Sequence, residues 1–127
     1  MKNELKEMDS LKGLEFLELA KEKFESSSGL TEQFAHFSKV FAKGFRTYLQ
    51  REYKATEIDI NRNHFEMYGF FKVGDTLWYY SVGDLRWDKT FLIRTAKNHE
   101  DFTGGTNNYV SMKSSEIFDE QMRKMIL

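Results

Sequence analysis

The 127-residue chain contains neither cysteine nor proline. Without cysteine it forms no disulfide bond and no thiolate–metal site, so its stability depends on packing and hydrogen bonding. The absence of cysteine also suits a reducing compartment, and we expect the protein to be cytoplasmic. Without proline, every residue after the first keeps its backbone N–H group, and no cis-proline isomerisation slows folding.

The sequence also lacks a long apolar run. No segment approaches the roughly 18 apolar residues of a membrane-spanning helix, and the charged start MKNELKEMDS has no apolar signal-peptide core. The net charge of −1 argues against a globally basic nucleic-acid-binding protein. We therefore expect no membrane contact and, at most, weak direct binding to nucleic acid.

Aromatic residues are plentiful instead. They make up 16% of the chain, including twelve Phe, which is more than an ordinary core of this size requires. We therefore expect some of these rings to lie at the surface. The length is typical of a single domain, which we place at residues 1–127, with the polar residues 1–9 flexible.

Two helices are predicted in the first half of the chain. Apolar residues recur at helical spacing from Ser10 to about residue 25, and Gly29 favours a stop after them. A second helix is predicted from Thr31 to Tyr53. Its aromatic face, which we interpret as core, consists of Phe34, Phe37, Phe41, Phe45 and Tyr48. The short connection makes the two helices an antiparallel hairpin.

The second half of the chain changes to the alternating pattern of strands. Strands are predicted around Ile58–Ile60 and at His64–Val73, Thr76–Val82, Phe91–Lys97 and Tyr109–Met112, with a turn at Asn61–Asn63. A last helix is predicted at Ser115–Met125. The fold class that follows is α+β, with an N-terminal helical hairpin packed on a four- to five-stranded antiparallel sheet and a C-terminal helix.

The pair Gly74-Asp75 predicts the register of the central hairpin, because a two-residue loop fixes which residues lie opposite each other. The predicted pairs are Val73 with Thr76, Phe71 with Trp78, Gly69 with Tyr80 and Met67 with Val82. One face should then meet the helices through Phe65, Met67, Phe71, Trp78, Tyr80 and Val82. Gly69 should leave room for the ring of Tyr80 to lie across its strand.

The opposite face of this hairpin carries aromatic residues among charged ones: Glu66, Tyr68, Phe70, Lys72, Leu77 and Tyr79. An open antiparallel sheet normally shows a polar face to water. Aromatic rings in this place could stack on bases, contact a partner protein, or lie under the C-terminal helix or a second copy of the chain. The sequence leaves these alternatives open.

A polar run from Arg94 to Asn108 is the most distinctive candidate for a site. It contains cations, His99, Asp101 and the pair Gly104-Gly105, whose amides could hold an anion. It is not a P-loop, and the chain has no nucleophile elbow or His-Glu-x-x-His motif. The histidines, His36, His64 and His99, show no metal-ligand spacing. We expect no catalytic residue, no cofactor and no metal.

Part of this run carries a resemblance to known proteins. The stretch from Leu92 to Lys97, through Thr103-Gly104-Gly105 to Asn108-Tyr109, resembles a pattern in small uncharacterised proteins of phages and mobile elements. The overall profile, short and single-domain without a catalytic motif, is similar to that of anti-CRISPR proteins. This resemblance implies an inhibitor that binds a nucleoprotein effector.

The sequence therefore predicts a non-enzymatic binding protein whose partner is a protein or ribonucleoprotein effector, with a homodimer left open. The expected partner contacts are Tyr68, Phe70, Tyr79, Arg86, Arg94, Lys97 and His99. One alternative is weak nucleic-acid binding by the sheet aromatics and by the basic side of the second helix, at Lys39, Lys43 and Arg46. Another is a small-ligand or enzyme site centred on Arg94, His99 and Asp101.

Overall fold

Helices form where apolar side chains repeat every three or four residues. The structure is a computed structural model, and it describes residues 16–25, 30–63, 66–83, 91–101 and 106–127. Helix α2 spans Phe16–Glu25, α3 spans Leu30–Tyr53 and α4 spans Ser115–Ile126. The predictions for residues 1–9, for the first turns of the first helix and for Gly29 lie outside the described residues.

The alternating part of the chain forms a five-stranded antiparallel sheet in which each strand pairs with the one before it. The strands are β1 (Thr56–Arg62), β2 (Met67–Val73), β3 (Thr76–Val82), β4 (Phe91–Ala96) and β5 (Asn108–Val110). Together with the helices that precede and follow the sheet, they confirm the predicted α+β class.

Several strand boundaries differ from the prediction by one to three residues, and two of the differences have a clear cause. The turn expected at Asn61–Asn63 begins later, because Arg62 still pairs with Met67 and the N–H of Asn63 donates to the carbonyl of Glu66 at 2.9 Å. The last strand ends before Met112, because the N–H of Ser111 donates to the side chain of Gln121 at 2.7 Å instead of to a strand. In both places a local hydrogen bond decides where the strand ends.

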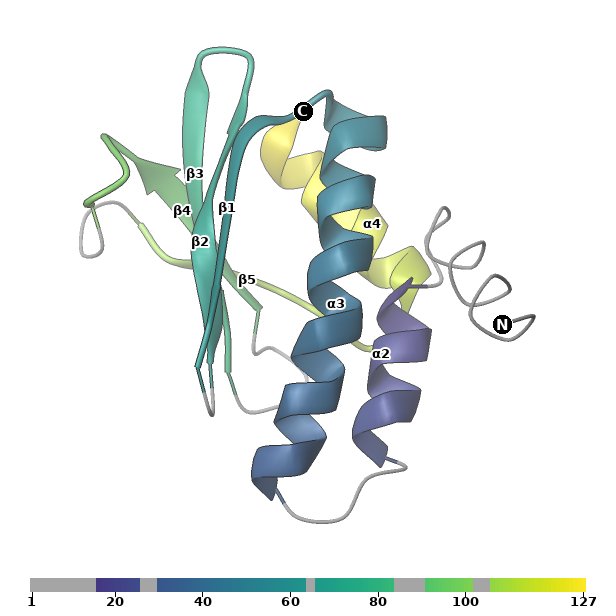
Figure 1. Ribbon diagram of the computed structural model, residues 1–127. Coiled ribbons are helices and arrows are strands. Elements are labelled where there is room, and N and C mark those ends of the chain that lie inside the picture. The colour runs from purple at the N-terminus through teal and green to yellow at the C-terminus, as the bar shows by residue number, and fades with distance from the viewer. Residues whose placement is uncertain (1–15, 26–29, 64–65, 84–90, 102–105) are drawn as a thin grey trace.

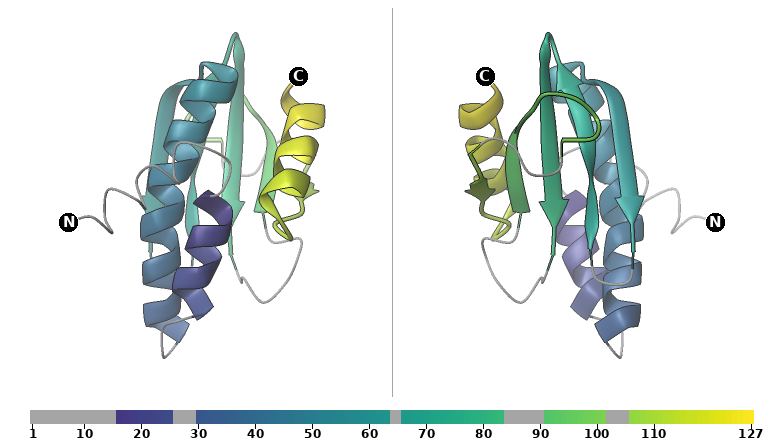
Figure 2. Two further views of the ribbon diagram at one scale, coloured as in Figure 1. Left: turned by 90° about the vertical axis from the view of Figure 1, so that its right-hand side faces the viewer. Right: turned by 90° about the vertical axis from the view of Figure 1, so that its left-hand side faces the viewer.

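The described helices all pack on one face of the sheet, which we call the inner face (Figure 1). Figure 2 shows from two further sides that α4 lies in the same layer as α2 and α3. The alternative in which the C-terminal helix covers the opposite face is therefore wrong. The C-terminal helix packs on the inner face because Phe118 of α4 contacts Phe41 of α3 and Phe91 of β4, with ring centroids 6.4 and 5.1 Å apart.

The aromatic face of α3 forms the centre of the core. Successive rings from Phe34 to Tyr48 contact one another with centroids 5.2 to 6.3 Å apart. Phe45 lies at the middle, 4.9 Å from Tyr80 of β3 and 5.5 Å from Phe91 of β4. The interpretation of this face as core is confirmed, and the core absorbs much of the aromatic excess of the sequence.

The register of the β2–β3 hairpin agrees with the prediction at each of the four pairs from Val73–Thr76 to Met67–Val82. Gly69 sits where a side chain has no room, since a Cβ atom there would lie 1.8 Å from the carbonyl oxygen of Asp59. The hydroxyl of Tyr80 passes over this glycine and donates to the same oxygen at 3.0 Å. The expectation for Gly69 and Tyr80 is thus confirmed. Phe65 lies outside the described residues.

A polar network joins the end of α3 to α4. The hydroxyl of Tyr48 donates to a carboxylate oxygen of Asp119 at 2.8 Å and also bonds the hydroxyl of Tyr53 at 2.8 Å. Arg123 donates from Nε to Asp119 at 3.0 Å and from Nη2 to Glu52 at 2.6 Å. Burial, followed by the hydrogen bonds to Tyr53 and Asp119, raises the pKa of Tyr48 well above its ordinary value, so the hydroxyl stays protonated.

Two side chains attach helix α2 to the first residue of α4 and to the segment before it. Glu18 accepts a hydrogen bond from the backbone N–H of Ser115 at 2.6 Å. Lys21 donates to the carbonyls of Met112 and Lys113 at 3.2 and 3.1 Å. Ser114 caps α4 itself, since its hydroxyl accepts from the N–H of Ile117. These bonds complete the helical layer on the inner face of the sheet.

Candidate functional site

The outer face of the sheet is the face opposite the helices. In its central row Phe70 of β2 lies between Asp59 of β1 and Tyr79 of β3, and Tyr79 lies between Phe70 and Arg94 of β4. Strand alternation forces this arrangement, because the inward partners of the same strands face the helices. The structure therefore brings together three of the predicted partner contacts, namely Phe70, Tyr79 and Arg94.

A short segment covers the middle of this row. Residues 97–101, which we call the strap, follow β4 and fold back across the outer face (Figure 2, right). The ring of His99 lies 5.1 Å from that of Phe70. Phe70 is 1% exposed and Arg94 is 2% exposed. The prediction that a partner contacts Phe70 and Arg94 directly must therefore be corrected, because the strap shields both side chains from solvent.

Arg94 binds the strap from the sheet side. Its guanidinium lies over the ring of Tyr79, 4.5 Å from the centroid. From there Nη2 donates to the backbone carbonyl of Asp101 at 2.7 Å and Nη1 donates to that of Thr95 at 3.2 Å. The Asp101 carboxylate lies 3.9 Å from Nη1 and partly balances the buried charge. This use of the guanidinium is structural, because it ties the strap to the sheet.

The strap is also closed by its own hydrogen bonds. A carboxylate oxygen of Asp101 accepts from the backbone N–H of Lys97 at 3.0 Å. The side-chain oxygen of Asn98 accepts from the N–H of Glu100 at 2.8 Å, and the N–H of Asp101 donates to the carbonyl of Asn98 at 3.1 Å. Short polar side chains make such local bonds readily, which explains why this sequence turns instead of continuing the strand.

Glu57 is a residue of the site that the sequence analysis missed. The register of β1 shifts between Thr56 and Asp59, and Glu57 adopts a left-handed backbone conformation there, with φ 51°. Its carboxylate lies 3.4 Å from Nε2 of His99 and 3.5 Å from Nζ of Lys72. Glu57 thus anchors the far side of the strap. The sequence did contain one indication of this role. Glu57 precedes Ile58 and lies two residues before Asp59, so strand alternation places both acids on the same face.

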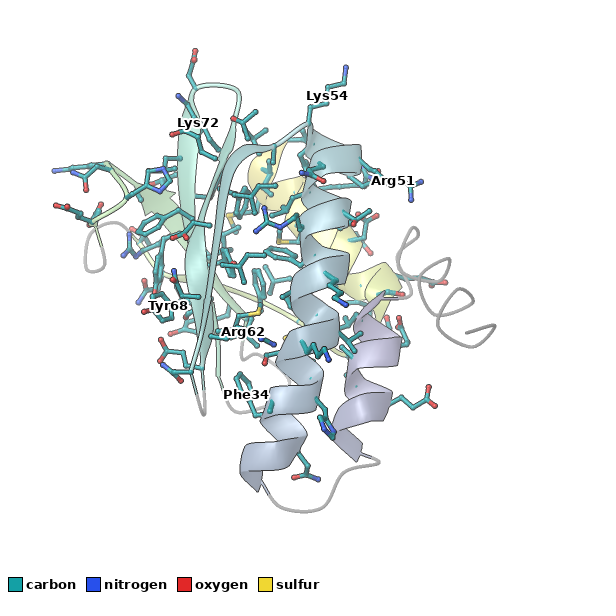
Figure 3. The ribbon with its side chains drawn as sticks, viewed as in Figure 1. Phe34, Arg51, Lys54, Arg62, Tyr68 and Lys72 are labelled. Carbon is teal, nitrogen blue, oxygen red and sulfur yellow. The ribbon has the colours of Figure 1, made fainter. Side chains whose placement is uncertain are left out.

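Tyrosine rings surround the covered centre. Tyr68 and Tyr79 are half-buried, and Tyr109 at the β5 edge is 52% exposed. Figure 3 shows Tyr68 and Lys72 on the side of the sheet away from α3. Burial and then the charge of Glu66 raise the pKa of Tyr79, which keeps its hydroxyl protonated. The outer face therefore presents tyrosine rings beside charged groups of both signs.

The other predicted residues differ in how near they lie to this row. Lys97 is exposed at its edge, and Arg86 lies outside the described residues. Arg94 and Asp101 contact each other, whereas His99 contacts Glu57 and Phe70. The exposed cations of the predicted basic stripe are on α3, in the other layer, at Lys39, Lys43 and Arg46.

Within the described residues, no three His, Asp or Glu side chains are grouped so that they could hold a metal ion. None of the described helices is both long enough and apolar enough to cross a membrane. Comparison with family models, with curated proteins and with solved structures gave no match. The function must therefore be inferred from the chain's own residues.

Proposed function

We propose that the protein is a non-enzymatic binding protein that acts through protein–protein contact at the outer face of its sheet. The observation that carries this proposal is the placement of the described helices, which all pack on the inner face. Half-buried Tyr68 and Tyr79 and the exposed ring of Tyr109 are left on the other side. Tyrosine often forms the energetic centre of an interface, because its large ring loses little conformational entropy on binding.

The charges near these rings favour a protein over a nucleic acid as the partner of this face. The acidic residues on the described outer face and strap are Glu57, Asp59, Glu66, Glu100 and Asp101. They outnumber the cations, which are Lys72, Arg94 and Lys97. Carboxylates repel phosphates, whereas a protein surface can supply charges of both signs to complement such a rim.

The partner class in this proposal is a nucleoprotein effector that the protein inhibits or modulates. This part rests on the resemblance of residues 92–97, 103–105 and 108–109 to a pattern in small phage and mobile-element proteins. A second copy of the chain, bound at the same face, is the competing partner. The two differ in a simple observable, since a homodimer forms in the purified protein alone.

The test is a comparison of variants in capture from the source cell. Immobilised protein is incubated with lysate, with and without nuclease, and bound protein and nucleic acid are identified by mass spectrometry. Tyr68→Ser/Tyr79→Ser should weaken capture of the partner by more than ~2 kcal/mol, which is about thirtyfold in affinity. The control is Gln50→Ser/Glu116→Ser, at two exposed positions on the helices, which should capture the partner normally.

Equal capture by the tyrosine variant and the wild-type protein, with both folded, would refute the proposal. If the tyrosine variant unfolds, Tyr109→Ser replaces it, because that ring is half exposed and its loss should leave the fold intact. A concentration-dependent dimer in the purified protein, abolished by the same variants, would assign the face to a second copy. Capture that nuclease abolishes would assign the contact to the nucleic acid of the effector.

A further inference from the structure

One stretch of α3 has cations without acids. Between Glu32 and Glu52 the sequence contains no acidic residue, although it includes Lys39, Lys43 and Arg46. In the chain as a whole, 20 acidic residues slightly outnumber 19 basic ones. An acid-free run of this length in a chain of nearly balanced charge creates a local positive potential that the net charge of −1 conceals.

These three cations lie on one side of the helix. Their spacing of four and then three residues places them in a row along the axis, which rises about 1.5 Å per residue. All three side chains are exposed, while Phe37, Phe41 and Phe45 of the same helix are fully buried. No ion pair joins any of the three to another described residue. Within the part of the chain that the structure describes, their charge is therefore not paired with a carboxylate.

A fourth cation extends this surface across to the sheet. Arg62 pairs with the inward-facing Met67, so it lies on the inner side of the edge strand β1, beside α3, and it is exposed. Figure 3 shows it at the end of β1 on the side where α3 packs. Burial and then the charge of Asp59 raise the pKa of Tyr80, whose hydroxyl bonds the Asp59 carbonyl of β1, and the charge of Arg46 acts against this shift.

The acids of β1 point the other way. Asp59 pairs with Phe70 and belongs to the outer face, and Glu57 contacts His99 of the strap. The strand therefore separates its charges, with carboxylates outside and Arg62 inside. In Figure 2, left, α3 lies between β1 and α2, and it contacts both of them, so the exposed side of α3 adjoins the sheet edge that carries Arg62.

We propose that the basic ridge, formed by Lys39, Lys43, Arg46 and Arg62, binds the phosphodiester backbone of a nucleic acid without reading its sequence. A row of separate cations on a regular helix matches a row of phosphates, which also repeats along a line. A folded acidic protein would need carboxylates concentrated in a comparable row. This surface is independent of the outer face, so the proposal goes beyond the protein contact described above.

The expected binding is weak and strongly dependent on salt. Affinity for duplex DNA or RNA should fall in the range of ~10⁻⁴ to 10⁻⁶ M at physiological salt, typical of non-specific contacts. Each phosphate neutralised on a duplex contributes about −0.9 to the slope of log affinity against log salt, so four cations give a slope of about −3.6. That slope corresponds to roughly a hundredfold loss between ~50 and ~200 mM salt.

The experiment measures fluorescence anisotropy of a labelled duplex and a labelled single strand over a salt series. Lys39→Gln/Lys43→Gln should reduce the steepness of the duplex slope by about 1.8, since two of the contacts are lost. The control, Lys113→Gln/Lys124→Gln, removes one exposed cation just before α4 and one within it, and it changes the net charge by the same amount as the ridge variant. It should leave the slope as it is in the wild-type protein. Thermal unfolding verifies that each variant is folded.

Three results would overturn the proposal. The first is absence of measurable binding at ~50 mM salt, where phosphate contacts are strongest. The second is an equal change of slope in both variants, which would mean that total charge and not the ridge determines binding. The third is ridge-dependent binding of a poly-glutamate peptide as tight as that of a nucleic acid of equal charge, which would assign the ridge to an acidic protein.

Discussion

The two faces of the sheet bury their side chains by different means. On the inner face Phe45 is enclosed by rings from α3, α4 and three strands, with centroids 4.9 to 6.4 Å away. On the outer face Phe70 is as well buried, but its cover is the strap, which hydrogen bonds and partly exposed ion pairs hold. The two rings are equally buried but are held by interactions of unequal strength. The free energy of apolar packing grows with the area buried, whereas exposed ion pairs contribute little.

The largest expected effect compares these two rings directly. Phe45→Ala should lower the free energy of unfolding by about 3 to 5 kcal/mol, because packed helices and strands cannot close around the space. Phe70→Ala should cost only about 2 kcal/mol, because the strap can settle onto the sheet. Urea denaturation followed by circular dichroism measures both. Equal losses would mean that the strap is as rigid as the helical layer.

A second prediction compares two glycines of the same hairpin. Gly69→Ala places a methyl group 1.8 Å from a backbone oxygen of β1, and we expect a loss of about 2 to 3 kcal/mol. At Gly74 a Cβ atom meets nothing within 4 Å, but φ is +58°, so Gly74→Ala should cost about 1 kcal/mol. Thermal unfolding distinguishes them. A smaller loss at Gly69 than at Gly74 would show that β1 can move away from β2.

The third prediction concerns pH and the inner layer. The folded-state pKa of Tyr48 is raised, whereas the unfolded chain ionises near pH ~10. The stabilisation is therefore complete below pH ~10 and is lost as the pH rises above it, because the unfolded state then binds fewer protons. Tyr48→Phe should lower stability by about 1 to 2 kcal/mol at neutral pH and make the alkaline loss shallower. An unchanged alkaline slope in urea titrations would contradict this.

The smallest expected effect concerns the anchor of the strap. A double-mutant cycle with Glu57→Gln and His99→Gln should give a coupling below about 1 kcal/mol, because both side chains are largely exposed. A coupling of several kcal/mol would place the strap among the rigid parts of the fold and remove the contrast between the two faces.

The inner face could be predicted because periodicity encodes it. The Phe spacing of α3 and the alternation of β2 and β3 indicate which side chains turn inward, and Gly74-Asp75 fixes the register through a two-residue loop. The burial of Trp78 and Tyr80 follows from that register alone. Local sequence and tertiary packing agree in this half of the molecule, so a reading of the sequence succeeds there.

The outer face was harder to predict, because irregular segments determine it. The alternating pattern ends near Lys97, and nothing in the polar residues that follow indicates that they return over Phe70 and Arg94. The bulge that turns Glu57 toward His99 depends on a backbone conformation that is unusual for glutamate. The side on which α4 packs is equally non-local, because it depends on rings of α3 that precede it by some seventy residues.

The order of the elements has a consequence for synthesis on the ribosome. Helix α3 is made before any strand that covers it, and Phe91 of β4 follows its end at Tyr53 by almost forty residues. At ~5 to 20 residues per second, the aromatic face of α3 waits a few seconds for its cover. During that interval the nascent chain exposes the apolar aromatic face of α3, so chaperone binding should be strongest while β1 to β3 are being translated.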